Sequence, residues 1–128
     1  MKISTRGRYA LRVMIDLAEQ QETGFIRLKD ISERQEISQK YLESIMTLLS
    51  KSGMVETAHG KGGGYKLSKA PKDYTVGDIL LLTEGSLAPV ACMDCVGPEC
   101  PRKDTCRTLP FWKSLDKKIT EFMQSVTL

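Results

Sequence analysis

The sequence predicts a mainly α fold with one small β-hairpin, and three features lead to that prediction. Apolar residues recur at helical spacing in three segments of the first 52 residues. Two short runs of alternating polarity then flank a glycine-rich turn, which is typical of a hairpin. A final segment repeats apolar residues at spacings of three and four. This order is that of a winged helix-turn-helix domain followed by a long C-terminal helix.

The first helix is predicted between a cap at Ser4 or Thr5 and about Gln20. A polar break separates it from a shorter helix over residues 28–35. The apolar residues that should face the core from this region are Leu11, Met14, Ile15, Ala18, Leu28, Ile31 and Ile37.

A third helix is predicted from about Gln39 to Ser52, because Ser38 is a good N-cap and Gly53 is well placed to end a helix. The hairpin follows over residues 54–68. The buried stripe of the third helix should contain Leu42, Ile45, Met46 and Leu49.

Thr75 opens a fourth helix through Thr83, in a capping-box-like start in which Asp78 reaches back toward the helix entrance. Residues 85–107 are rich in Gly, Pro and Cys and lack apolar periodicity, which is unusual unless something folds them. Pro110 lies near the start of the last helix, where proline is tolerated. The apolar seam of that helix, a candidate dimer contact, is Trp112, Leu115, Ile119, Phe122 and Val126.

The chain therefore divides into three predicted parts. They are a winged helix-turn-helix domain over 1–84, a cysteine-rich loop over 85–107 and a long final helix over 108–128, for which DNA binding, cluster binding and dimerisation are the candidate functions.

Composition narrows the class of protein. The chain has 128 residues, 41% hydrophobic and 27% charged, which suits a globular protein with one modest core. No segment reaches the roughly 18 apolar residues of a membrane span, and no secretory leader is visible, so we expect a cytoplasmic protein without membrane contact. Residues 1–70 carry 12 Lys and Arg against 8 Asp and Glu, a bias that permits nucleic-acid binding. With one histidine and no nucleotide-binding loop, the chain is not expected to be an enzyme.

The third helix and the hairpin form a candidate DNA-reading surface. A recognition helix presents its N-terminal residues to base edges in the major groove, and a glycine-rich hairpin tip can approach a minor groove closely. The alternative is a protein-interaction domain with a solvated basic face. The residues predicted to contact DNA are Ser38, Gln39, Lys40, Tyr41, Glu43 and Ser44 of the helix, His59, Lys61, Gly62 and Gly63 of the hairpin tip, and Arg8 of the first helix.

Four cysteines, Cys92, Cys95, Cys100 and Cys106, fall within 15 residues. In a reducing compartment such clustering favours metal or redox chemistry over a structural disulfide framework. Four thiolates suit an iron–sulfur cluster or a structural zinc ion, although zinc sites more often use two Cys-x2-Cys pairs. A thiol–disulfide switch is the third interpretation. An electron-transfer or cluster-carrier protein that has a basic domain is a further alternative.

Several segments resemble the iron–sulfur cluster regulator family typified by IscR. They are ISTRGRYALRVMIDLA (3–18), DISERQ (30–35), ISQKYLE (37–43) and GKGGGYKL (60–67), and the resemblance extends over essentially the whole chain. It implies a homodimer that binds double-stranded operator DNA as a repressor or dual regulator. It also implies that residues 38–44 read bases, that the glycine-rich wing reaches the minor groove, and that a cluster is the sensor.

Two departures from that family change the expectation. Its cluster-binding members resemble this chain at every cysteine except Cys95, and typically add a histidine three residues after the last cysteine, where this chain has Leu109. We expect Cys95 to replace that histidine, giving an all-cysteine site of lower potential. We favour a [2Fe–2S] over a [4Fe–4S] cluster, a choice that four cysteines do not decide. In the wing, His59 stands where arginine is common and should contribute less in a narrow minor groove.

Overall fold

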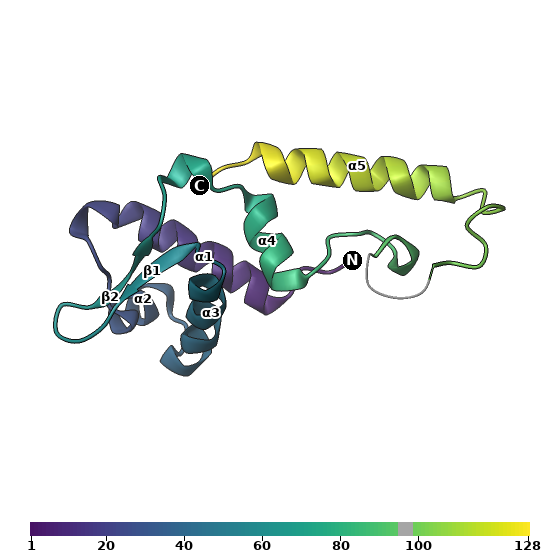
Figure 1. Ribbon diagram of the computed structural model, residues 1–128. Helices are drawn as coiled ribbons and strands as arrows, with labels where there is room; N and C mark the ends of the chain where they lie inside the picture. The colour runs from purple at the N-terminus through teal and green to yellow at the C-terminus, as the bar shows by residue number, and fades with distance from the viewer. Residues whose placement is uncertain (95–98) are drawn as a thin grey trace.

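The computed structural model describes residues 1–94 and 99–128, and its elements follow the predicted order (Figure 1). The helices are α1 (Thr5–Glu19), α2 (Leu28–Gln35), α3 (Gln39–Lys51), α4 (Val76–Glu84) and α5 (Leu109–Ser125). The strands β1 (Val55–Ala58) and β2 (Gly64–Leu67) form an antiparallel hairpin, in which Val55 pairs with Leu67 and Ala58 with Gly64. Single 3-10 turns occupy η1 (Gln21–Thr23), η2 (Pro71–Asp73) and η3 (Ala91–Met93).

Local sequence sets the helix ends as predicted. The hydroxyls of Ser4, Ser38 and Thr75 each accept a hydrogen bond from the backbone N–H three residues later, at 3.0 to 3.2 Å. Gly53, just past α3, has a φ of 80°, a left-handed conformation that favours glycine. The start of α3 matches the prediction because its capping signal, Ser38, is local, and the bounds of α2 also match, although its N-cap residue Arg27 makes no side-chain capping bond.

The core lies between α1, α2, α3, the base of the hairpin and α4. The predicted stripe of α3 is fully buried. The buried face of α1 differs from the predicted one: Met14 is buried, but Ile15 is 45% exposed. The reason is that α4 packs along α1 in addition to α2 and α3. The apolar residues of α1 that are buried are Ala10, Val13, Met14 and Leu17.

The hairpin is extended by one residue of the loop before α2, a feature the sequence analysis did not predict. Ile26 and Tyr65 exchange both backbone hydrogen bonds, each at 2.8 Å. Gly64 allows this approach, since a Cβ at that position would lie 2.2 Å from the carbonyl oxygen of Ile26. The half of β2 nearer the hairpin tip is therefore joined to the loop before α2.

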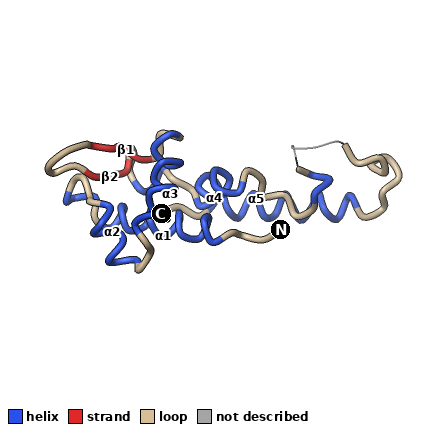
Figure 2. Tube along the Cα trace, turned by 90° about the horizontal axis from the view of Figure 1, so that it is seen from below, coloured by secondary structure: helices blue, strands red, loops and turns tan. Residues whose placement is uncertain are grey.

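α5 lies beside α4, and the cysteine-rich segment lies at the opposite end of the molecule from the hairpin in both views (Figures 1 and 2). Every residue of α5 keeps some exposed surface, and Phe122 of the predicted seam is 70% exposed. Asp78 differs from its predicted role, because its carboxylate accepts from Gln124 Nε2 of α5 at 3.2 Å instead of reaching back to the start of α4. Among residues 1–94 and 99–128, every helix is too short or too polar to cross a bilayer.

Candidate nucleic-acid interface and cysteine cavity

The turn between α2 and α3 fixes how α3 leaves the core. Glu36 adopts a left-handed conformation with a φ of 54°, and Ser32 Oγ donates a hydrogen bond to the carbonyl of Ile37 at 2.6 Å. Ile37 itself is buried. Three residues, 36–38, thus connect the two helices, and the N-terminus of α3 is exposed.

The predicted residues of α3 lie together on the exposed side of its first two turns. Ser38 caps the helix, and Ser44 Oγ donates to the carbonyl of Tyr41 at 2.9 Å, so both hydroxyls already have partners within the helix. The longer side chains of Gln39, Lys40 and Glu43 are exposed. The structure therefore brings these predicted residues onto one surface, and their contact with DNA stays a prediction.

An aromatic contact adds α1 to this surface. The rings of Tyr9 and Tyr41 meet edge to face with centroids 5.5 Å apart. The guanidinium of Arg12 lies 5.3 Å from the centre of the Tyr9 ring. The predicted phosphate contact Arg8 is exposed on the same helix, where its Nη2 donates to Thr5 Oγ1 at 3.0 Å. Sequence reasoning missed Tyr9, because an aromatic residue at helical spacing is more often a core residue.

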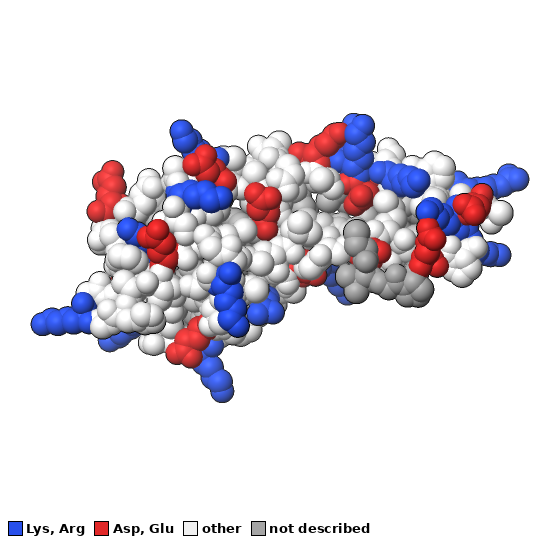
Figure 3. Space-filling model, viewed as in Figure 1, with Lys and Arg blue, Asp and Glu red and all other residues white. Residues whose placement is uncertain are grey.

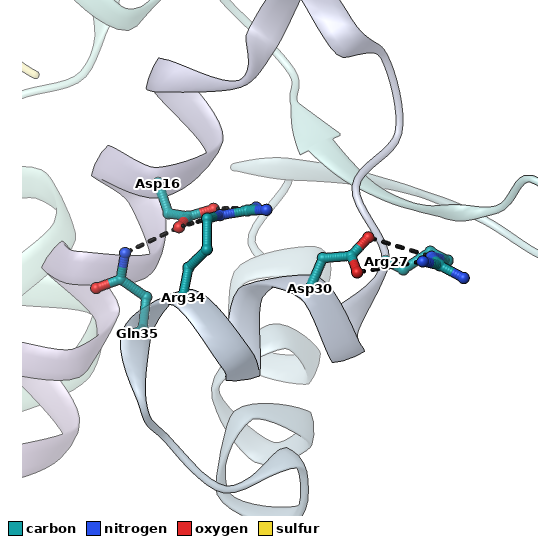
Figure 4. A network of polar contacts seen from close by, with 5 residues as sticks. All are labelled: Asp16, Arg27, Asp30, Arg34 and Gln35. Carbon is teal, nitrogen blue, oxygen red and sulfur yellow. Dashed lines mark hydrogen bonds and ion pairs between the residues drawn. The ribbon is translucent and has the colours of Figure 1, made fainter.

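A buried carboxylate holds α2 against α1 (Figure 4). Asp16 of α1 is 2% exposed and accepts hydrogen bonds from Arg34 Nε and Nη2 at 3.0 and 2.8 Å, and from Gln35 Nε2 at 2.8 Å. The bond to Asp16 raises the pKa of the Arg34 guanidinium above its ordinary value. The same figure shows a second ion pair for contrast. It joins Arg27, the N-cap residue of α2, to Asp30 in the first turn of that helix, and it lies at the surface.

The Asp16 contacts matter for the recognition surface because only three residues separate α2 from α3. Sequence reasoning missed this role. The available signal was an acidic residue placed among the apolar positions of an amphipathic helix, followed by a nearby Arg-Gln pair.

The hairpin tip is an exposed tight turn. Gly60 and Gly62 have φ values of 82° and 80°, and a Cβ on Gly63 would lie 2.4 Å from the carbonyl oxygen of Ala58. His59 and Lys61 are exposed there. Lys and Arg side chains protrude at the hairpin end of the molecule and along the edge below α2 and α3 (Figure 3).

A groove joins the recognition helix to the wing. Ser50 Oγ of α3 and Thr57 Oγ1 of β1 are 2.5 Å apart. A cavity of about 380 Å³ lies beside this contact, and its lining includes Lys51, His59 and Tyr65. Among the residues predicted to contact DNA, His59 lines this cavity, and the remaining lining residues come from the C-terminal half of α3 and from the two strands.

The three described cysteines line one cavity of about 430 Å³ at the far end of the molecule. Cys92, Cys100 and Cys106 are free thiols, and Leu109 and Lys113 of α5 line the same cavity. Across residues 1–94 and 99–128, no group of three or more His, Cys, Asp or Glu is close enough to hold a metal ion. The predicted ligand Cys95 lies outside the described residues.

The chemistry of these donors suits a thiolate-bound centre. Thr108 Oγ1 lies 3.2 Å from Cys106 Sγ, and hydrogen bonding from this hydroxyl is the main cause that lowers the pKa of the Cys106 thiol below its ordinary value, with backbone hydrogen bonds and Arg102 assisting. Thiolates are the form that ligates iron and the form that attacks disulfides. Three thiols around one hollow therefore fit an iron–sulfur cluster as donor types. Leu109 contributes no donor atom to it.

Comparison with known proteins gives one consistent family. The family described as "Rrf2: Iron-dependent Transcriptional regulator" matches residues 3–128. The HTH-type transcriptional regulator IscR of Klebsiella pneumoniae is 38% identical over all 128 residues of this chain, which correspond to 77% of that protein. Among solved structures, T. potens IscR matches 99% of this chain and 82% of its own with a TM-score of 0.78 and 36% identity. CymR, "the Global Cysteine Regulator of B. subtilis", matches 99% and 92% with a TM-score of 0.79 and 35% identity.

Proposed function

Because the chain belongs to the Rrf2 family of transcriptional regulators, we propose that it represses transcription at operator DNA under the control of an iron–sulfur cluster bound by its cysteines. It is a DNA-binding regulator of the IscR type and, as the sequence analysis expected, not an enzyme. The observation that carries the sensing part is that Cys92, Cys100 and Cys106 line one cavity together with the first turns of α5. We keep the expectation of a cytoplasmic protein, because a repressor must reach the chromosome.

In this proposal α3 enters the major groove and the hairpin tip lies on the neighbouring minor groove. The exposed side chains of Gln39, Lys40 and Glu43 support base or backbone contact by α3. Lys61 brings a positive charge to the tip, and the glycines there let the backbone approach the DNA. Arg8 would bind a phosphate, which fixes the register of the complex without reading its sequence.

The active form is proposed to be a homodimer joined by α5. The seam residue Phe122 is 70% exposed, and an apolar ring left in water favours burial against a partner. A dimer presents two recognition helices to half-sites about 34 Å apart, one turn of DNA. Analytical ultracentrifugation tests this directly: we expect a dimer for the wild-type chain and a monomer for Phe122→Asp, whereas a monomeric wild-type chain would contradict the proposal.

Cys92, Cys100 and Cys106 would hold the cluster, with Cys95 as the predicted fourth ligand and [2Fe–2S] as the predicted type. A bound cluster supplies iron- and oxidation-dependent chemistry to the site. The protein's own part is to keep thiolates available, which the hydrogen bonds of Thr108 do for Cys106. Leu109 and Lys113 connect the same cavity to α5.

The regulation follows from this placement. Ligation by Cys92, Cys100 and Cys106 would fix the start of α5, which lines the same cavity, and α5 in turn packs on α4 of the DNA-binding part. Operator affinity must differ between the loaded and the empty protein, because a ligand shifts only equilibria between states that it binds unequally. Coupling of about 1–3 kcal/mol is typical of such systems.

The first experiment is an anaerobic absorbance spectrum with iron, sulfide and zinc analysis of freshly purified protein. We expect a brown protein with visible bands and matched iron and sulfide, and weaker or altered operator binding after the cluster is removed. A colourless protein with about one zinc per chain would overturn the cluster assignment in favour of a structural metal. Equal operator binding by loaded and empty protein would overturn its regulatory role.

A second candidate is a regulator that senses oxidants through a thiol–disulfide switch at the same cysteines. Two observations favour it: the lowered pKa of the Cys106 thiol and the likeness to a protein described as a global cysteine regulator. Reconstitution with iron and sulfide separates the two candidates. Failure to take up iron, combined with reversible loss of DNA binding on mild oxidation, would favour the switch.

A further inference from the structure

Tyr74 lies in the segment between η2 and α4, and its hydroxyl joins both ends of the hairpin. The side chain is 2% exposed. Its hydroxyl donates to the carbonyl of Met54, just before β1, at 2.6 Å. The same oxygen accepts from the backbone N–H groups of Ser68 and Lys69, just after β2, at 3.0 and 3.1 Å. One hydroxyl thus uses its single donor and both acceptor positions to hold the base of the wing.

The backbone of Tyr74 is joined to the chain that leaves α5. Residues 126–128, which we call the return segment, run antiparallel to residues 74–76. Leu128 N donates to the carbonyl of Tyr74 at 3.3 Å, and Val76 N donates to the carbonyl of Val126 at 2.9 Å. Just before this segment, Gln124 Oε1 accepts from Thr75 Oγ1 at 2.8 Å.

We propose that Tyr74 is a positioning residue that transmits the placement of α5 to the DNA-binding wing. The inference rests on the proposed function and names the route by which the distal end of the molecule regulates its DNA-binding surface. The far end of α5 borders the cysteine cavity, and its near end leads into the return segment. Tyr74 contacts the return segment through its carbonyl and the hairpin through its hydroxyl. It therefore connects the end of α5 directly to the wing.

The physical reason lies in the burial of the hydroxyl. Tyr74 is 2% exposed, so the loss of its bonds leaves a buried hydroxyl unsatisfied. Its partners Met54, Ser68 and Lys69 keep some exposed surface, and Ser68 N also donates to the carbonyl of Met54 at 3.3 Å. If the return segment moves, Tyr74 either carries the ends of the hairpin with it or breaks these bonds. In both cases the wing tip changes its position or its mobility relative to α3.

The first test needs no DNA. Leu128→Pro removes the N–H that bonds to the carbonyl of Tyr74, and Leu128→Ala keeps that N–H but removes a similar amount of packing. We expect hydrogen exchange of the Lys69 amide, which the Tyr74 hydroxyl holds, to be about tenfold faster in the proline variant than in the alanine variant. Equal exchange in the two variants would overturn the proposal, since position 128 would then not influence the wing.

The second test measures whether Tyr74 and the return segment act together on DNA. The probe is a duplex recovered from a randomised pool by selection with the full wild-type chain, titrated at one salt concentration. We expect Tyr74→Phe and Leu128→Pro each to weaken binding about three- to tenfold, and the double variant to be about as weak as either single one. Thr83→Val, which removes a half-buried hydroxyl bonded only within α4, serves as the control for general destabilisation.

Independent effects would multiply in the double variant and would overturn the proposal, as would losses no larger than that of Thr83→Val. Recovery of no specific duplex would count against the proposed function instead, and the hydrogen-exchange comparison would still decide the role of Tyr74.

Discussion

Residues 1–84 and residues 85–128 bury their side chains very differently. Every fully buried apolar residue of the described chain lies between Ala10 and Leu80, and the buried carboxylate of Asp16 is satisfied by three hydrogen bonds. In the second region, Cys92 is exposed, Cys100 and Cys106 are half-exposed, and α5 keeps surface exposed throughout. The first region therefore has a buried core, whereas the second presents thiols and an amphipathic helix whose apolar side chains keep exposed surface.

The largest effect we expect is that of removing a cysteine. This effect should be confined to residues 85–128. Cys106→Ser removes a thiol that lines the cavity and whose pKa is already lowered. Reconstituted protein should lose most of its bound iron and its visible absorbance, because serine is a poor ligand for iron–sulfur clusters. The thermal unfolding of the region around α1 and α3 should stay unchanged. Full iron uptake by the variant would exclude Cys106 as a ligand.

Removal of a buried charge should affect only the first region. Asp16→Asn replaces the buried carboxylate by a neutral amide, a weaker acceptor for Arg34, whose side chain is 39% exposed, and should lower the free energy of unfolding by about 1–3 kcal/mol. The matched control is Asp30→Asn, which breaks the exposed pair with Arg27 and should cost about 0–1 kcal/mol. Urea unfolding followed by circular dichroism measures both. If the free energy of unfolding fell by similar amounts in the two variants, the stability contributed by the Asp16 contacts would not depend on their burial.

The wing charge should influence DNA affinity without a change in stability. Lys61→Ala removes a cation from the exposed hairpin tip, so operator binding should weaken several-fold. If Lys61 contacts a phosphate, the slope of log affinity against log salt should also become shallower by about 0.9. Titrations at four salt concentrations measure both quantities. Lys72→Ala, an exposed lysine of η2 outside the predicted contacts, is the control, and an equal change in its slope would argue against a specific role for the tip.

The smallest expected effect concerns the acidity of Cys106. Thr108→Val removes the hydroxyl that is the main cause of the lowered pKa of this thiol, so the pKa should rise toward its ordinary value. Because alkylation follows the thiolate, the midpoint of the pH profile for iodoacetamide labelling of Cys106 should shift to higher pH in the variant. An unchanged profile would indicate that the Thr108 contact does not stabilise the thiolate in solution.

Much of the fold could be predicted because its signals are local. The caps at Ser4, Ser38 and Thr75, the glycine after α3 and the turn glycines of the hairpin determine backbone geometry within a few residues of themselves. The clustering of the cysteines predicted that they hold one centre, which stays a prediction, and the three described cysteines line one cavity. For Cys95 and for the DNA-contacting residues, the sequence analysis still provides the working hypothesis.

The tertiary structure decided the features that join distant segments. Ile26 pairs with Tyr65, Asp16 bonds to Arg34, and the Tyr74 hydroxyl holds both ends of the hairpin. None of these pairs has a local signature, because each depends on how complete elements pack. The same reason explains the face of α1: helical periodicity indicates an apolar stripe, but the neighbours on α2, α3 and α4 determine that Val13 is buried and Ile15 is exposed. The N-cap hydrogen bonds of Ser4, Ser38 and Thr75 were thus readable from the sequence alone, whereas the partner of Asp78 and the burial of each side chain, which depend on distant neighbours, were settled only by the packed fold.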